Sequence, residues 1–394
     1  MLDVRHRRPT ARLVLAVVTV ALVAVTTGCA RGIRLDLGAP ERVADGVLLY
    51  RLANPSLLDS PGPIAVQVLR LDPAKVDLRC ALARDRVMAL ETIPEMAART
   101  NALAAVNAGF FVVRNGDPAG LLEVAGELVS ESALMRGAVG VVRAPGKPIR
   151  LVFDRVTAAV TLRLQAGNEP FTVPVDGIDT TRIRGKLMLY TPRFGQDSDT
   201  ADTGVEWQVA GLPPRVTARR PNAGRTPIPQ DGFVLSFGGT VLPTALERLE
   251  TGQLVSFETT FQTSFGTLPD TWSEAGDIVG GAGLLVYRGT PVSDWSEEQL
   301  RAGFTTERHP RTMIGVSRGG TIWVITVDGR DPQASIGMTF AELQRLALGL
   351  NLTYALNLDG GGSTTMVVKG RVVNHPSEPT GPRRVSDGIL VVAR

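Results

Sequence analysis

The stretch 353–365 contains the densest group of residues that could do chemistry. It reads Thr-Tyr-Ala-Leu-Asn-Leu-Asp-Gly-Gly-Gly-Ser-Thr-Thr, so a strand-like run delivers Asn357 and Asp359 to Gly360, Gly361 and Gly362. Glycine adopts backbone conformations closed to other residues, and successive N–H groups in such a turn can converge on an anion. Hydroxyl groups from Ser363 onward add donors. We therefore expect an anion-binding site here; a Gly-rich hairpin is the alternative. A nucleotide-triphosphate loop is not indicated, because it needs Gly-Lys-Ser/Thr.

Four other clusters combine polar residues with strand ends. Arg311-Thr312 opens a strand-like run, where a guanidinium can hold a phosphate or carboxylate through two bonds. Asp328-Gly329-Arg330 ends the next run and could equally be a plain β-turn. Asn107-Ala108-Gly109-Phe110-Phe111 joins an amide to two aromatic residues and could equally be a core-facing turn. Asn374-His375-Pro376-Ser377 holds one of the three histidines.

Composition excludes several classes of function. The chain has 394 residues, is 44% hydrophobic and carries a net charge of +3, without a run of basic residues interleaved with aromatics, so nucleic acid is not an indicated partner. Three histidines and two cysteines are too few for a typical structural zinc site, and we expect no metal and no cofactor. Cys80 stands in an alternating strand-like run and is expected to be buried and inert.

The first 29 residues follow the order of a secretory signal. Basic residues lead an apolar run over 13–25, and Thr26-Thr27-Gly28 stands before Cys29. The run is short for a membrane span. The pattern predicts a lipoprotein-type signal peptide over 1–28, lipidation of Cys29 and a tether over 29–46, which would place the protein on the extracytoplasmic face of the cell membrane. An ordinary cleaved signal with an incidental cysteine is the alternative; both imply export.

The elements that must position these residues are mostly strands. Capping boxes at Thr92 and Thr339 predict two short helices, and the second has a Leu343, Leu346, Ala347, Leu350 stripe at helical spacing. The remainder predicts an α+β fold with mixed sheets, few helices and one strand-rich catalytic domain over 47–394, in which 138–265 is especially β-rich. The stretch 212–230 carries five prolines and is predicted to be a surface loop.

These motifs, in this order along the chain, resemble the phosphodiester glycosidase family. The resemblance runs from about Gly46 to the C-terminus, and its most specific element is Asn357–Ser363. The others are Asn107–Phe111, Tyr190-Thr191-Pro192, Gly280-Gly281, Arg311-Thr312, Asp328-Gly329-Arg330, Gly337-Met338-Thr339 with Glu342-Leu343, and Val373-Asn374 with Arg383-Arg384-Val385. The family often has a second glycine where this chain has Ala108.

The resemblance implies cleavage of a sugar–phosphate diester at the glycosidic C–O bond. A carboxylate would steady the oxocarbenium-like centre or activate water, and Asp359 and Asp328 are the candidates. Arg311, Thr312, Arg330 and the Gly360–Ser363 backbone would hold the phosphate, while Asn107 and Asn357 would orient sugar hydroxyls. Glu342 is explained by its capping box and is expected to be structural.

Two other functions fit the same residues. A non-catalytic envelope protein could bind phosphodiester-linked or anionic wall polysaccharide in this cleft without turning it over. A glycan hydrolase could act on uncharged polysaccharide, although converging arginines would favour the diester. Which of Asp359 and Asp328 serves as nucleophile or base does not follow from their spacing.

Overall fold

The computed structural model describes residues 35–166, 169–239 and 241–394, and residues from Ile33 onward form one compact unit. The predicted signal peptide and Cys29 lie outside the described residues. In the described part of the chain, no helix has the length and apolar character needed to cross a membrane. The strand-rich α+β class is confirmed, because several sheets are accompanied by only four α-helices among these residues.

The largest sheet has eight strands and supplies most of the site. Its order is β1 (Glu41–Ala44), β2 (Val47–Leu52), β3 (Val66–Leu71), β24 (Ile322–Val327), β23 (Arg311–Ser317), β25 (Leu352–Asn357), β21 (Leu284–Tyr287) and β22 (Thr290–Pro291). All six residues of β24 are buried, as expected of a central strand with apolar residues on both faces. Helix α4 (Phe340–Gly349) contributes Leu343, Leu346 and Ala347 to an apolar cluster that includes residues of this sheet.

A second sheet of five strands shares a core with the first. Its order is β27 (Arg371–Val372), β26 (Met366–Val368), β6 (Ala104–Asn107), β29 (Asp387–Ala393) and β4 (Val76–Leu82). Helix α1 (Ile93–Arg99) packs Ile93, Met96 and Ala97 against it. One apolar cluster joins side chains of both sheets, including Ile314 and Met366. The site forms where these two sheets meet.

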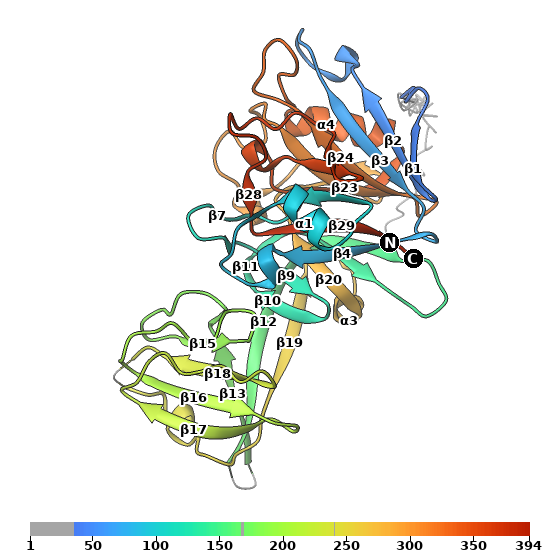
Figure 1. Ribbon diagram of the computed structural model, residues 1–394. Helices are drawn as coiled ribbons and strands as arrows, with labels where there is room; N and C mark the ends of the chain where they lie inside the picture. Colours follow the sequence, from blue (N-terminus) through green and yellow to red (C-terminus); the bar gives the residue numbers. More distant parts are fainter. Residues whose placement is uncertain (1–34, 167–168, 240) are drawn as a thin grey trace, which may run out of the picture. The chain divides into compact units, whose positions relative to one another are not determined.

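The middle of the chain forms two further sheets, drawn in green and yellow in Figure 1. The first has the order β10 (Glu127–Ser130), β9 (Leu122–Val124), β20 (Ala275–Gly280), β11 (Ser132–Val142), β12 (Arg150–Ala166) and β13 (Glu169–Val175), with β19 (Val255–Thr263) also paired to β12. The second has the order β14 (Gly177–Ile178), β15 (Leu187–Tyr190), β18 (Gly232–Phe237), β16 (Val205–Ala210) and β17 (Arg215–Pro221). Strand β12 pairs with β11 along its first part and with β13 along its last.

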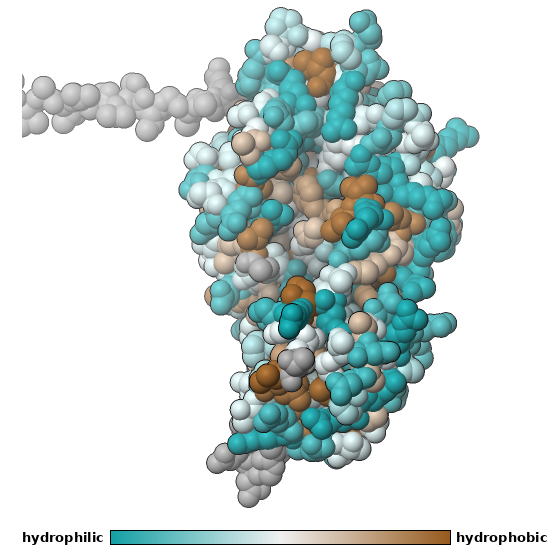
Figure 2. Space-filling view, turned by 90° about the vertical axis from the view of Figure 1, so that its left-hand side faces the viewer, coloured by the Kyte–Doolittle hydropathy of each residue, from teal (hydrophilic) through white to brown (hydrophobic). Residues whose placement is uncertain are grey.

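Short elements complete the chain. Strand β5 (Glu91–Thr92) pairs with β28 (Arg384–Val385), and β7 (Phe111–Val112) pairs with β8 (Asp117–Pro118); the remaining helices are α2 (Thr244–Glu247) and α3 (Pro269–Ser273). The 3-10 turns are η1 (Pro55–Leu57), η2 (Ala83–Asp85), η3 (Ser296–Glu298) and η4 (Gly361–Ser363). Figure 2 shows a face on which apolar residues form small separate patches among polar ones.

One predicted loop is wrong. The stretch 212–230 contains strand β17, which pairs only with β16 at the edge of its sheet. Its prolines lie before the strand, at its last residue and after it, and an edge strand tolerates them there. The expectation for Cys80 is confirmed: the thiol is free and buried, and burial raises its pKa well above the usual value.

Candidate active site

The glycine loop is fixed by the ends of strands from both sheets. It leaves β25 in the first sheet, turns through η4 and enters β26 in the second. Leu358 N–H donates to Thr312 O at 2.9 Å, Asp359 N–H to Ala108 O at 2.9 Å and Gly361 N–H to Pro310 O at 2.8 Å. The loop is therefore held on either side by the chain around Ala108 and by the start of β23.

Glycine is required at Gly361. Its φ is +58°, a conformation that side chains rarely adopt. A Cβ at this position would also lie 2.8 Å from Nη2 of Arg330. The glycine therefore allows a guanidinium from the turn after β24 to lie directly over the loop. No hydrogen bond or ion pair of this guanidinium occurs within the described residues, so the cation is free to bind an anion.

Asp359 is a half-buried residue whose carboxyl has lost most of its water. This burial raises its pKa to about 6. The Gly360 N–H and the charge of Arg383 lower the pKa, whereas the charge of Asp387 adds to the rise. Gly360 N–H donates to Asp359 Oδ1 at 2.9 Å. The carboxyl is thus held by its own loop and titrates near neutral pH, which suits acid–base or charge-stabilising chemistry.

Asn107 joins the two sheets to the loop. Its Nδ2 donates to Asp359 O at 2.6 Å, and its Oδ1 accepts from Thr312 Oγ1 at 2.8 Å and from Thr365 N–H at 3.1 Å. The amide is buried and these bonds use both of its ends. Asn107 and Thr312, which were expected to contact substrate, therefore position the backbone that carries Asp359.

Asp328 is buried and its carboxylate already accepts three hydrogen bonds. Asn374 Nδ2 and His375 N–H each donate to Oδ1 at 3.0 Å, and Gln67 Nε2 donates to Oδ2 at 3.1 Å. Burial raises its pKa, and these bonds oppose the rise. Asn374 also donates to Thr364 O and accepts from Met366 N–H. The geometry thus favours Asp328 as a group that positions the loop through Asn374.

Arg311 is buried at the start of β23. Its Nε donates to Met338 O, and its Nη2 donates to the carbonyl oxygens of Phe304 and Glu307, at 2.9–3.0 Å. The guanidinium carbon lies 5.4 Å and 5.0 Å from the ring centroids of Phe304 and Phe340. Burial lowers its pKa to about 10. Nη2 donates to the 304–307 segment and Nε donates to Met338, which leaves Nη1 as the atom that could reach a phosphate.

Several buried oxygen atoms around the loop have no hydrogen-bond partner among the described residues. They are Asn357 Oδ1, Ser363 Oγ, Thr364 Oγ1, Thr365 Oγ1 and, on the facing turn, Ser377 Oγ. Asn357 Nδ2 is satisfied, because it donates to Ala282 O and Leu358 O. Buried polar atoms are usually paired, since leaving one unpaired costs about 1–3 kcal/mol. Four of the five lie within the nine residues 357–365, which indicates a place where water or a ligand supplies the missing partners.

The backbone of the loop is less available to an anion than its glycines suggest. The N–H groups of Gly360, Gly361, Ser363 and Thr364 all donate to acceptors within the protein. Gly362 N–H is the one in this short stretch of the described chain without such an acceptor. The expected ring of converging N–H donors is therefore reduced to one, and side chains must supply the remaining anion contacts.

Sequence reasoning missed two acidic residues beside the loop, Glu378 and Asp387. Glu378 pairs with Arg383, and a Cβ at Gly362 would overlap both, so this pair lies over the loop opposite Arg330. Asp387 is buried, accepts from Gly109 N–H at 2.6 Å and influences the pKa of Asp359. The Arg383-Arg384-Val385 motif could have pointed to the pair of Glu378 and Arg383. Asp387 follows it by two residues at the start of β29 and had no signal of its own.

Several of the candidate residues lie close together in this geometry. Asn107, Thr312 and Asp359 are joined by hydrogen bonds, Arg330 lies over Gly361, and Asp328 reaches Thr364 through Asn374. Glu342 is structural, as expected: its carboxylate accepts from Thr339 and Asp59 N–H groups and pairs with Arg308. No group of three or more metal-ligating side chains occurs in the described part of the chain.

Comparisons with known proteins point to one family. Residues 204–392 match the family model described as phosphodiester glycosidase. The bovine (Bos taurus) N-acetylglucosamine-1-phosphodiester alpha-N-acetylglucosaminidase is 36% identical over 87 residues, which is 21% of this chain and 16% of that protein. Alignments with the curated relatives cover only 11–18% of the relatives' own length.

Two solved structures share the fold over most of the chain. A hypothetical protein from Synechocystis has a TM-score of 0.74 at 23% identity, over 91% of this chain and 64% of that one. A Burkholderia pseudomallei K96243 protein, with a provisional description as exported, has a TM-score of 0.71 at 25% identity, over 85% of this chain and 75% of that one. The fold is therefore one that these two proteins also adopt.

Proposed function

We propose that the chain contains a phosphodiester glycosidase domain, which the family match over residues 204–392 supports, and that it hydrolyses the glycosidic bond of a sugar-1-phosphodiester. Water supplies a hydroxyl group to C1 of the sugar and a proton to the departing phosphate oxygen, so the products are a free sugar and a phosphomonoester. The substrate belongs to cell-envelope or extracellular glycan material, because the chain is expected to be exported and anchored through a lipid on Cys29.

One observation carries the proposal. The Asp359 carboxyl, whose pKa is about 6, lies in a loop that also holds four buried oxygen atoms without partners in the described structure, and the guanidinium of Arg330 lies over Gly361 of this loop. A phosphodiester needs a cation on its phosphate, and a cationic sugar centre needs a carboxylate close by. The unpaired oxygen atoms of the loop would then meet sugar hydroxyls or ordered water.

Each residue of the site has a separate role in the proposed hydrolysis. Asp359 in its charged form stabilises the oxocarbenium-like centre or removes a proton from the attacking water. Arg330 neutralises the phosphate from above Gly361, with Gly362 N–H and Nη1 of Arg311 as further donors. Asn107, Thr312 and Asp328 hold the loop in place. Because a phosphomonoester is a good leaving group, no strong general acid is required beside it.

The alternative is a protein that binds envelope phosphodiesters without cleaving them. The hydrogen bonds of Asp328 favour this alternative. Three donors within the protein already bind its carboxylate, so Asp359 is the one predicted carboxylate that could still contact a substrate. A typical glycosidase uses two carboxylates, although a good leaving group relaxes that need.

The test is turnover in water labelled with oxygen-18. Purified protein is incubated with UDP-N-acetylglucosamine and, separately, with sugar phosphodiesters released from bacterial walls. Label found in the free sugar supports cleavage of the glycosidic C–O bond, whereas label in the phosphate indicates a phosphodiesterase instead. Asp359→Asn is the inactive variant, and Asp231→Asn, at an exposed position in the middle of the chain, is the matched control. Binding without release of sugar by the unmodified protein would establish the non-catalytic alternative.

A further inference from the structure

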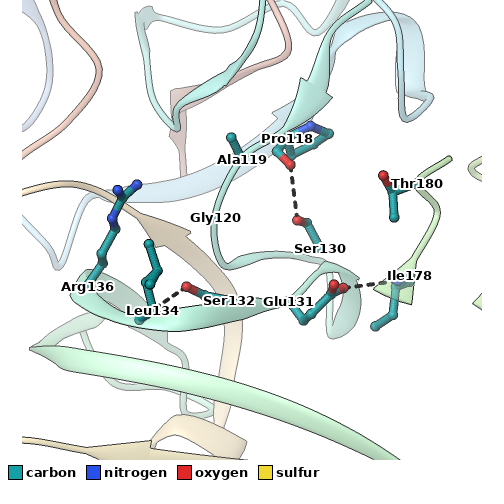
Figure 3. Close-up of a pocket in the computed structure, with 10 residues that line it drawn as sticks. All are labelled: Pro118, Ala119, Gly120, Ser130, Glu131, Ser132, Leu134, Arg136, Ile178 and Thr180. Atoms are coloured by element: carbon teal, nitrogen blue, oxygen red, sulfur yellow. Dashed lines mark hydrogen bonds between the residues drawn. The ribbon is translucent and has the colours of Figure 1, made fainter. Parts of the chain in front are cut away.

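A cavity of about 240 Å³ lies between strands β8–β11 and the turn after β14. Figure 3 shows its lining around the Gly120 loop, with the Arg136 side chain on one side and Thr180 on the other. Ser130, Glu131 and Ser132 complete the polar lining. All of these residues precede the family match at 204–392. The cavity is therefore a feature of this chain outside the matched region.

Short links connect this cavity to the candidate active site. Asp359 N–H donates to Ala108 O, and two residues later Phe110 O accepts from the N–H of Ala119, which lines the cavity. Between them stands an aromatic pair: the rings of Phe110 and Phe304 are 6.2 Å apart and inclined by 54°, and both residues are half-buried. The glycine loop and the lining of the cavity are therefore linked through the short segment 108–110.

The lining has the chemistry of a carbohydrate site. Arg136 Nε donates to Glu298 O, and its two terminal nitrogens make no hydrogen bond within the described structure. Glu131 Oε2 accepts from Ile178 N–H at 3.0 Å, which leaves Oε1 for a ligand. Sugar hydroxyls both donate and accept, so they fit a lining that combines a guanidinium, a carboxylate and hydroxyl groups. The presence of both charges argues against a strongly anionic occupant.

The size points to one sugar unit of a longer chain. Pockets for drug-sized ligands measure about 300–1,000 Å³, so 240 Å³ accommodates a smaller group. A second hollow of about 490 Å³ shares Glu131, Ser132 and Ile178 with the first and continues along β12 and β19. Neighbouring hollows of this kind suit a chain molecule rather than a single compact ligand.

We propose that the cavity around Gly120 is a subsite for an uncharged sugar unit of the substrate, and that the substrate is an extended glycan phosphodiester rather than a sugar nucleotide. This inference rests on the proposed function, because it extends the substrate of the same site. The unit bound here lies one step beyond the sugar phosphate held at Asp359, with the Phe110–Phe304 pair beneath the connection.

Gly120 allows the cavity to be filled without disturbing the fold. A Cβ at this position meets no atom within 4 Å, and its backbone is not in the left-handed region. The series Gly120→Ala, Gly120→Leu and Gly120→Trp therefore fills the cavity in steps. Gly319, in the exposed turn between β23 and β24, is equally open, so Gly319→Trp is the matched control. That turn lies at the opposite end of the hairpin from Arg311 and Val327.

The kinetic test compares two probes: the methyl phosphodiester of N-acetylglucosamine 1-phosphate and wall-derived sugar phosphodiester fragments of at least three sugar units. We expect the longer probe to have a KM roughly tenfold lower in the unmodified protein, since filling a subsite adds binding in the ground state. Gly120→Trp should remove this advantage and leave kcat and KM for the methyl ester within about twofold. Gly120→Ala should keep most of the advantage. An unchanged preference in Gly120→Trp overturns the proposal.

A binding test separates failure of the subsite from failure of the proposed function. The longer fragments are titrated calorimetrically into Asp359→Asn with glycine, leucine or tryptophan at position 120. Weaker binding with each larger side chain supports the subsite even if no turnover is found with any probe. Equal binding by all three variants, or no binding by any, rejects the subsite even if the methyl ester is cleaved. Gly319→Trp must bind like the unmodified protein.

Discussion

The carboxyl of Asp359 titrates near 6 in the folded protein because burial disfavours its charge, whereas an exposed aspartate titrates near 3.8. The folded state therefore binds more protons than the unfolded state between about pH 4 and pH 6. The contribution of this group to stability is fully present below pH 4 and is lost as pH rises through 6. At neutral pH the charged carboxylate lowers the free energy of unfolding, as is common for groups that serve function rather than stability.

Asp359→Asn separates these two effects. We expect turnover to fall by a hundredfold or more, since the charge that stabilises the sugar cation is removed. The melting temperature at pH 7.5 should be unchanged or higher, because the cost of the buried charge disappears, and the two proteins should differ least near pH 4. Rate, affinity and melting temperature are measured together. A fully active variant would show that the loop is only a turn.

The same pKa sets the pH dependence of turnover. If charged Asp359 acts on the substrate, kcat/KM should fall about tenfold per unit as pH decreases below about 6 and should be level above it until another group titrates. The profile is measured with the short methyl phosphodiester to limit changes in binding. A fall above pH 6 instead would assign Asp359 the role of a proton donor.

Arg330 and Arg311 should respond differently to loss of charge. Arg330→Gln removes a cation without partners in the described structure, so KM should rise roughly tenfold with little change in melting temperature. Arg311→Gln removes the donor to three backbone carbonyls and should cost about 1.5–3 kcal/mol of stability. Substrate titration and thermal denaturation of both variants check this. If both variants lose the same affinity for substrate and keep the stability of the unmodified protein, Arg311 binds the phosphate as Arg330 does.

At the level of elements, Asp328 links β3, β24 and the turn that follows β27. In Asp328→Asn an amide N–H would face Gln67 Nε2, which cannot turn without losing the bond from Thr326 Oγ1 to Gln67 Oε1. We expect a loss of about 1.5–3 kcal/mol in stability, with activity falling in parallel.

The double variant Asp328→Asn with Gln67→Glu tests this account of Asp328. The new glutamate can accept from the new amide, so stability should be recovered. Recovery of activity as well would confirm a positioning role for Asp328. Recovery of stability alone would mean that its charge acts on the substrate.

The sequence predicted the elements with strong local signals. Helices α1 and α4 both begin at the predicted capping boxes, and α4 also has a stripe at 3.6-residue spacing. Strand β17 was missed because its alternation is weak and prolines surround it. The strand-end motif Asp328-Gly329-Arg330 also singled out Arg330, whose guanidinium lies over Gly361 in the structure. Use of Arg311 and of the loop N–H groups by the protein itself was not predicted, because it depends on how the 304–307 segment and the glycine loop fold around these donors.

For the whole molecule, we propose attachment to the membrane through a lipid on Cys29. The motif predicts cleavage after Gly28 and acylation of the new N-terminal cysteine. Mass spectrometry of protein purified from membranes should find a diacylglyceryl-modified N-terminal peptide, and Cys29→Ser should release the protein from the membrane fraction. An unmodified N-terminus elsewhere would contradict the anchor and leave export to be tested separately.

The glycine loop is also the piece of chain that passes from the eight-stranded sheet to the five-stranded one. Its amides at Leu358, Asp359 and Thr365 donate to strand β23, to Ala108 and to Asn107. Local opening of this loop would break contacts of both sheets at once. In terms of native-state amide exchange, the loop then belongs to the most protected cooperative unit rather than to a separately fluctuating segment. The substrate must accordingly fit a preformed loop, and any movement that admits it is left to the surrounding turns.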